Sequence, residues 1–108
     1  MMNGPLNERG RMSRALAEEK GFGASYTVES AAMYIALMHS ELSEMLEAVR
    51  AGSPRSEKIA TSLEAEEAAD LLIRLTHYCS VRGIDLDEAV ALKHEYNKGR
   101  PFKHGKKF

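Results

Sequence analysis

The sequence predicts an all-α protein, and three observations predict it. Apolar residues recur at spacings of three and four over long stretches, which is typical of amphipathic helices. No segment shows the alternation of apolar and polar residues that a half-buried strand requires. Each of the stretches is followed by a glycine, where helices commonly end: Gly21, Gly52, Gly83 and Gly99.

A chain of 108 residues is expected to form one domain with a single core of modest size. We therefore expect residues 1–108 to be a single all-α domain. Its loose or docking termini are expected at residues 1–6 and at about residues 100–108.

Charge and cysteine content narrow the class of protein. The formal net charge of −1 favours neither a nucleic-acid-binding protein nor an acidic tail, so no nucleic acid is expected as a partner. Cys79 is the one cysteine, which excludes an internal disulfide and is typical of a reduced cytosolic compartment. The sequence shows no signal peptide and no apolar run long enough to span a bilayer. We expect a cytoplasmic protein with no membrane partner.

The first two predicted helices differ in the strength of their apolar pattern. Asn7 is the expected N-cap of a first helix that continues to about Lys20 and has only a thin apolar stripe. Thr27 is the expected N-cap of a second, longer helix that ends at residues 52–54. In this second helix apolar residues recur every seven positions, which is typical of a helix packed along its length on another. The repeat consists of Val28, Ile35, Leu42 and Val49.

Two further helices complete the predicted protomer. The third is expected to begin between Ser56 and Ser62 and to stop at Gly83. Asp85 begins a capping-box pattern for a fourth helix that continues to about Lys98. Because four short helices leave much apolar surface, we expect a homodimer in which the helices of two copies complete a bundle.

Two pairs of acids interrupt the apolar faces of the second and third helices. Glu41 and Glu44 are three residues apart and extend an apolar face, and Glu67 and Asp70 repeat this spacing on the next helix. An unpaired carboxylate on a buried face is costly, so a bound cation would explain the acids. If the helices pack antiparallel, four carboxylates meet in an oxygen-only site that suits Mg²⁺ or Mn²⁺. The alternative is a pair of solvated helix edges, with Asp70 and Arg74 as a surface ion pair.

Positive charge gathers at the end of the chain. From Lys93 to Phe108 there are five lysines and Arg100 against one acid. Lys93 and Asn97 are four residues apart on one helical face, from which they can contact phosphate oxygens. A solvated, flexible tail is the alternative interpretation of this segment.

The order of these motifs resembles the MazG-like family of all-α nucleoside triphosphate pyrophosphohydrolases, in particular its short single-domain members. The motifs are Glu41-x-x-Glu44, then Glu67-x-x-Asp70, then Lys93-x-x-x-Asn97-x-x-Arg100-Pro101-x-x-His104-Gly105, and the resemblance covers residues 31–107. It implies a helical dimer or dimer of dimers that uses Mg²⁺ to hydrolyse (deoxy)nucleoside triphosphates to monophosphate and pyrophosphate.

The resemblance also implies roles for single residues. The implied metal ligands are Glu41, Glu44, Glu67 and Asp70, and the first two of these are the expected catalytic residues. The expected substrate-binding residues, on the phosphate side, are Lys93, Asn97, Arg100, His104 and Lys106. Ser40 stands where many members of the family have a further acid, which leaves any role of that acid open.

Two interpretations from other classes of protein remain open. In the first, the chain is a non-catalytic helical dimerisation or interaction module. In the second, it is a nucleic-acid-binding adaptor that uses its basic tail. Neither interpretation accounts for acids that continue an apolar face.

Overall fold

The computed structural model describes residues 2–21 and 27–102, and it confirms the all-α prediction. Within these residues the chain forms four helices and no strand. The helices are α1 (Pro5–Glu19), α2 (Val28–Arg50), α3 (Leu63–Arg82) and α4 (Leu86–Lys98). No helix in this described part is long and apolar enough to cross a membrane.

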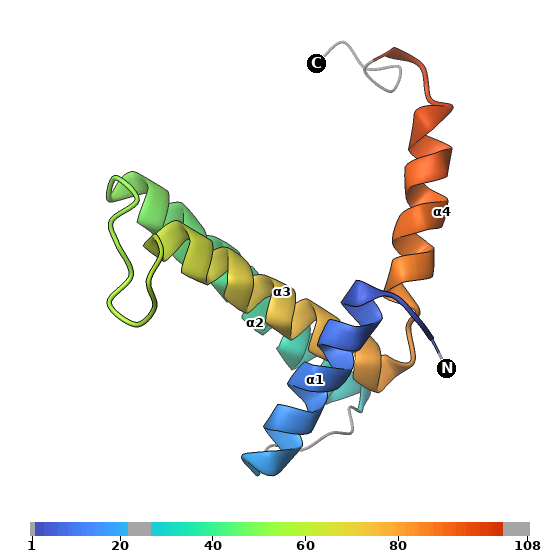
Figure 1. The fold of residues 1–108 in the computed structure, drawn as a ribbon, viewed down its shortest axis with the longest axis horizontal. Coiled ribbons are helices and arrows are strands. Elements are labelled where there is room, and N and C mark those ends of the chain that lie inside the picture. Colours follow the sequence, from blue (N-terminus) through green and yellow to red (C-terminus); the bar gives the residue numbers. More distant parts are fainter. Residues whose placement is uncertain (1, 22–26, 103–108) are drawn as a thin grey trace.

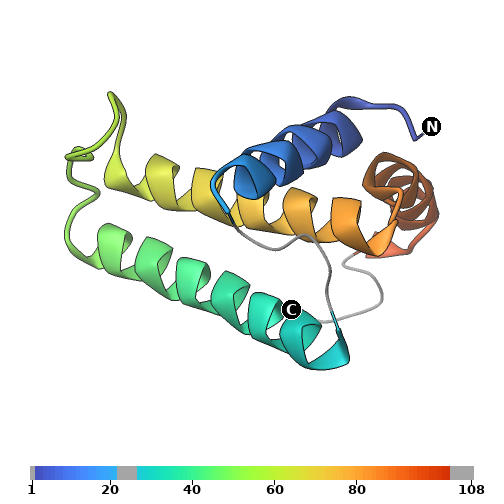
Figure 2. The ribbon, with the colours of Figure 1, turned by 90° about the horizontal axis from the view of Figure 1, so that it is seen from below.

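Helix α3 is the centre of the fold. Helices α2 and α3 run antiparallel side by side, and α1 crosses α3 on the side away from α2 (Figures 1 and 2). Helix α4 follows the C-terminal end of α3 (Figure 1). Among the other helices, α4 packs mainly against α1. Because α2 and α3 are antiparallel, the second half of α2 lies beside the first half of α3. The predicted acids lie in these two segments.

The predicted N-caps Thr27 and Asp85 agree with the structure, and Ser62, the last residue of the predicted start range of the third helix, caps that helix. The Thr27 side chain accepts a hydrogen bond from the amide of Ser30, whose side chain in turn accepts from the amide of Thr27. Ser62 caps α3 and Asp85 caps α4 through one hydrogen bond each, which the side chain accepts from the amide three residues on. Local sequence therefore sets the start of these helices.

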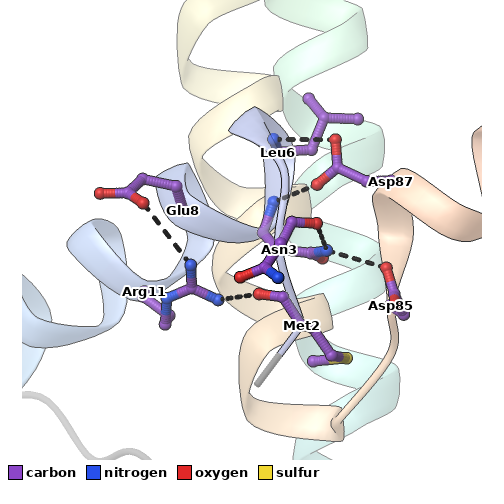
Figure 3. Close-up of polar contacts among 8 residues, drawn as sticks. Met2, Asn3, Leu6, Glu8, Arg11, Asp85 and Asp87 are labelled. Atoms are coloured by element: carbon purple, nitrogen blue, oxygen red, sulfur yellow. Dashed lines mark hydrogen bonds and ion pairs between the residues drawn. The ribbon is translucent and has the colours of Figure 1, made fainter.

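The start of α1 differs from the prediction. Asn7 was expected as its N-cap, but the helix begins at Pro5 and Asn7 is a buried residue within it. A carboxylate from another helix replaces the missing local cap. Asp87 of α4 accepts hydrogen bonds from the amides of Leu6 and Asn7 at 3.2 and 2.7 Å (Figure 3).

The side chain of Asn7 in turn forms hydrogen bonds with α4, so side chains of both helices contribute to the contact between α1 and α4. Its side-chain amide donates to Asp85 Oδ1 at 2.8 Å, and its oxygen accepts from the amide of Leu86 at 3.0 Å. The hydrogen bond from Asn7, followed by that from the Glu88 amide, lowers the pKa of Asp85. We call Asn7, Asp85, Leu86 and Asp87 the α1–α4 junction, and it fixes the direction in which α4 leaves the body (Figure 3).

The apolar core of a single chain is small. Helices α1 and α3 approach so closely that a Cβ atom on Gly10 would lie 2.3 Å from the carbonyl oxygen of Thr76, a residue that is 1% exposed. The buried apolar residues of the described chain are all small, namely Ala31, Ala48 and Cys79. The radius of gyration is 16.4 Å, whereas a compact domain of this length has about 13 Å. Much apolar helix surface is thus left uncovered within one chain.

Candidate metal centre

The two predicted acid pairs meet between α2 and α3. One carboxylate oxygen each of Glu41, Glu67 and Asp70 lies within 4.8 Å of the others. Glu44 completes the group, because its carboxylate is within hydrogen-bonding reach of Glu41 and Glu67. We call these four residues the acidic cluster.

The α2–α3 loop holds the start of α3 in the register that the cluster needs. The amide of Leu63 donates to the carbonyl of Pro54 at 2.7 Å. Ser53 donates through its hydroxyl to Glu64 at 2.7 Å, and the hydroxyl of Ser56 donates to the buried Glu66. The neighbouring acids Glu64 and Glu66 therefore bind the α2–α3 loop, whereas Glu67 belongs to the acidic cluster with α2.

Burial differs across the acidic cluster. Glu41 is 6% exposed and Glu67 is 8% exposed, whereas Asp70 is half-buried and Glu44 is exposed. The Oε2 atoms of Glu41 and Glu67 are buried and have no hydrogen-bond partner in the part of the chain that the structure describes. Buried carboxylate oxygens without a partner are unfavourable, and a cation or a shared proton would relieve this cost.

Arg74 is the site residue that the sequence analysis missed. Its Nε donates to Glu41 Oε1 at 2.8 Å across the two helices, and its charge also opposes the rise in the pKa of Asp70. The available signal was its position four residues after Asp70 and seven after Glu67, which places it on the same face of α3. Arg74 satisfies one oxygen of Glu41, and the other oxygen is buried without a partner among the described residues.

The acids have different affinities for protons. The hydrogen bond with Glu44, then burial and the charges of its neighbours, raise the pKa of Glu67 to about 7. Burial, followed by the charges of Glu41 and Glu66, raises the pKa of Asp70. Burial also acts on Glu41, but hydrogen bonds, chiefly from Arg74, outweigh it and lower the pKa of that carboxyl. Near neutral pH the metal-free cluster therefore retains a proton on Glu67 for part of the time.

This proton makes the stability of the metal-free protein depend on pH. The pKa of Glu67 is about 7 in the folded protein and 4.5 ordinarily. Its contribution to stability is complete below the ordinary value and is lost as pH rises through the folded value. We expect the thermal midpoint measured in chelator to fall between about pH 5 and about pH 8. A midpoint that rises over this range would contradict the environment described for Glu67.

A hollow adjoins the acidic cluster. It has a volume of about 510 Å³, within the range of small-molecule sites. Glu44 and Glu67 form part of its wall beside small apolar side chains, so it offers both an acidic and an apolar surface. The lining residues are Ser43, Glu44, Glu47, Ala48, Ala51, Leu63 and Glu67. A second hollow of about 540 Å³ lies between α1 and α3 and contains none of the four acids.

The predicted phosphate-binding residues lie elsewhere. Lys93 Nζ is 4.5 Å from the centroid of the Tyr96 ring, and Arg100 Cζ is 5.9 Å from it, so both cations flank one aromatic ring on α4. The Asn97 side-chain oxygen is buried without a hydrogen-bond partner among the described residues. The structure does not bring these residues to the acidic cluster of the same chain, because α4 points away from α2 and α3 (Figure 1). The predicted His104 and Lys106 lie outside the described residues.

The fold and the cluster define the class as a small all-α protein with a carboxylate-lined site between two antiparallel helices. Comparisons with protein-family models, with curated proteins and with solved structures gave no match to this chain. The resemblance of its motifs to the MazG-like family therefore stays a prediction from the sequence.

Proposed function

We propose that this protein hydrolyses (deoxy)nucleoside triphosphates to monophosphate and pyrophosphate in the presence of Mg²⁺, with Mn²⁺ as a plausible substitute. One observation carries the proposal: one carboxylate oxygen each of Glu41, Glu67 and Asp70 lies within 4.8 Å of the others, and Glu41 and Glu67 each have a buried oxygen without a hydrogen-bond partner among the described residues. Oxygen-only ligand sets of this kind suit hard divalent cations. The motif order that resembles MazG-like pyrophosphohydrolases supports the choice of reaction.

The residues present fit a divalent cation. Glu41, Glu67 and Asp70 would hold it through one oxygen each, because these atoms already lie within 4.8 Å of one another. Glu44 would complete the set from the exposed edge. Arg74 holds the other oxygen of Glu41 and so orients that carboxylate toward the ion.

Different residues of the chain would have different roles in the reaction. When bound, a divalent ion would neutralise phosphate charge and make a water molecule more acidic. Glu44 is exposed and lines the hollow, so we assign to it the orientation of the attacking water and the acceptance of its proton. The apolar side chains Ala48, Ala51 and Leu63 would receive the less polar part of the nucleotide.

We also propose that the working unit is a homodimer, or a dimer of dimers. Its support is the stripe of large apolar residues that α2 leaves exposed. Four of these residues, each 43–50% exposed, are Ile35, Leu42, Leu46 and Val49. A stripe of this length on a 23-residue helix is typical of a surface that another helix covers.

The proposed function is tested by measuring pyrophosphate release from a panel of nucleoside and deoxynucleoside triphosphates with Mg²⁺. We expect release from at least one nucleotide, dependence on the metal, and a loss of at least about a hundredfold in Glu41→Gln, because a ligand and the Arg74 contact are lost together. Glu57→Gln, which removes an exposed charge in the α2–α3 loop, is the control and should keep its activity. No pyrophosphate from any nucleotide, or equal release by Glu41→Gln, would refute the proposal.

A non-catalytic helical interaction module is the second candidate, and the exposed stripe on α2 is the observation that favours it. Such a module has no use for the acidic cluster. Mg²⁺ and chelator should then give the same thermal midpoint, whereas the hydrolase requires a midpoint that rises with Mg²⁺.

A further inference from the structure

The hollow between α1 and α3 takes no part in the proposed reaction. It has a volume of about 540 Å³, within the range of small-molecule sites. Its lining residues come from α1 with its C-cap Lys20, and from α3, which contributes Ile73 and His77. None of the four acids of the acidic cluster is among them, so this hollow is a surface separate from the cluster.

Large apolar side chains line this hollow and are still exposed. Met12 and Leu16 of α1 are 53% and 56% exposed, and Ile73 of α3 is 45% exposed. Met12 and Leu16 are four residues apart, so they share a face of α1. Exposed apolar side chains that gather at one concave place are typical of a binding site. Burial of these three side chains would stabilise the apolar body of a ligand.

The charged side chains at this hollow are positive. Arg9 and Lys20 line it, and no aspartate or glutamate of the described chain does. The structure gives neither of these two side chains an ion pair or a hydrogen bond among the described residues, whereas Arg14 of the same helix is bound to Glu18 at 3.2 Å. Unpaired cations beside an apolar wall are complementary to an anion that has an apolar body.

The other polar residues of the hollow do not oppose an anion. The hydroxyl of Ser13, one helical turn after Arg9, can donate a hydrogen bond to the same anion. Burial, followed by the charge of Arg14, lowers the pKa of His77, so its ring is uncharged near neutral pH. Glu18 is the acid whose charge acts on His77, and Arg14 binds it. The positive charge at the hollow is therefore not compensated by its lining residues.

These charges disfavour a second copy of the chain as the occupant. In a two-fold dimer the same face of both subunits meets. Arg9 and Lys20 are the first and last lining residues on this side, about 16 Å apart along the helix direction. Antiparallel contact would bring Arg9 to Lys20 of the partner subunit, and parallel contact would bring equal residues together. Both arrangements place like charges side by side, which is unfavourable.

We propose that the hollow between α1 and α3 binds a free amphipathic carboxylate, such as a medium-chain fatty acid. The guanidinium of Arg9 offers two parallel donors that match a carboxylate, and Ser13 offers a third. The aliphatic chain of the ligand then lies along the apolar wall toward Lys20, whose methylene stem extends that wall and whose charge attracts the anion. The inference is independent of nucleotide hydrolysis, since the hollow contains no residue of the acidic cluster.

The first test measures binding to the full-length protein by calorimetry. Decanoate, methyl decanoate and decyltrimethylammonium have similar chains and differ in charge. We expect decanoate to bind at one site per chain and at least about tenfold more tightly than the other two. No binding of decanoate up to about 1 mM, or equal binding of the cation, would overturn the proposal. Binding of anionic lipid vesicles without binding of free decanoate would overturn it in favour of a membrane surface.

The second test locates the ligand and removes the cations. In methyl NMR spectra of labelled methionine, decanoate should shift the signal of Met12 and leave that of Met33, which is 58% exposed on α2, unchanged. Arg9→Gln/Lys20→Gln should weaken decanoate binding at least about tenfold, with an unchanged circular dichroism spectrum. Arg55→Gln, which removes an exposed cation from the α2–α3 loop, should bind like the wild type. A shift of Met33 without one of Met12, or equal affinities of the two variants, would overturn the proposal.

Discussion

Replacing Glu67 by glutamine is expected to stabilise the metal-free protein and to remove its response to Mg²⁺. The raised pKa of Glu67, about 7, shows that its ionised form is disfavoured by Glu44, by burial and by the other acids. Glutamine keeps the shape and removes the charge. At about pH 8 in chelator we expect a gain of about 2 kcal/mol, or roughly 10 °C in the thermal midpoint.

Mg²⁺ should stabilise the wild type much more than Glu67→Gln. The wild type is expected to gain about 2.7 kcal/mol when Mg²⁺ is at a hundred times its dissociation constant, whereas Glu67→Gln should gain little. Thermal unfolding followed by circular dichroism, with chelator and with Mg²⁺, measures both effects. Glu57→Gln removes an equal charge from an exposed loop position and should leave the midpoint and the metal response unchanged. A Glu67→Gln protein less stable than wild type in chelator would show that the cluster is not under charge repulsion.

The second large effect is expected from Arg74→Met. This substitution removes the hydrogen bond to Glu41, whose side chain is 7% exposed, and leaves its carboxylate buried without a cation. Breaking a buried pair in this way costs about 3–5 kcal/mol. Because the Arg74 side chain is itself 39% exposed, we expect about 2–3 kcal/mol, measured by urea unfolding in chelator. Mg²⁺ should restore part of this loss, since it supplies the missing positive charge.

Arg50→Met is the matched control for Arg74→Met. Arg50 makes an equally short contact of 2.8 Å with Glu47, but both side chains are about two-thirds exposed, at 66% and 69%. Its removal should change the free energy of unfolding by less than about 0.5 kcal/mol. Equal losses in the two variants would mean that Glu41 is not held as a buried charge.

The helices and the proximity of the four acids could be predicted from local patterns in the sequence. Thr27 and Asp85 are caps whose partners lie three residues on, so their effect is visible in sequence. The spacing of Glu41 with Glu44, and of Glu67 with Asp70, fixes which side chains share a face. Antiparallel packing of two neighbouring helices then brings the pairs together.

The features that sequence missed depend on contacts between distant residues. Asn7 has the chemistry of an N-cap, but Asp87 caps α1 from 80 residues away and frees Asn7 for another partner. Arg74 was read as a neighbour of Asp70, yet the packing of α3 on α2 aims it at Glu41. The direction of α4 depends on the same distant junction, so no periodicity within residues 86–98 predicts it.

The α1–α4 junction also sets an order of assembly. The hydrogen bonds between Asn7 and residues 85–87 join segments 78 to 80 positions apart, which makes them slow to form compared with the local α2–α3 hairpin. During synthesis, α1 stays without its carboxylate cap until α4 has been made. Helices α2 and α3 can pair before that moment, so the acid-bearing hairpin is expected to form early and α4 to be fixed in its outward direction last.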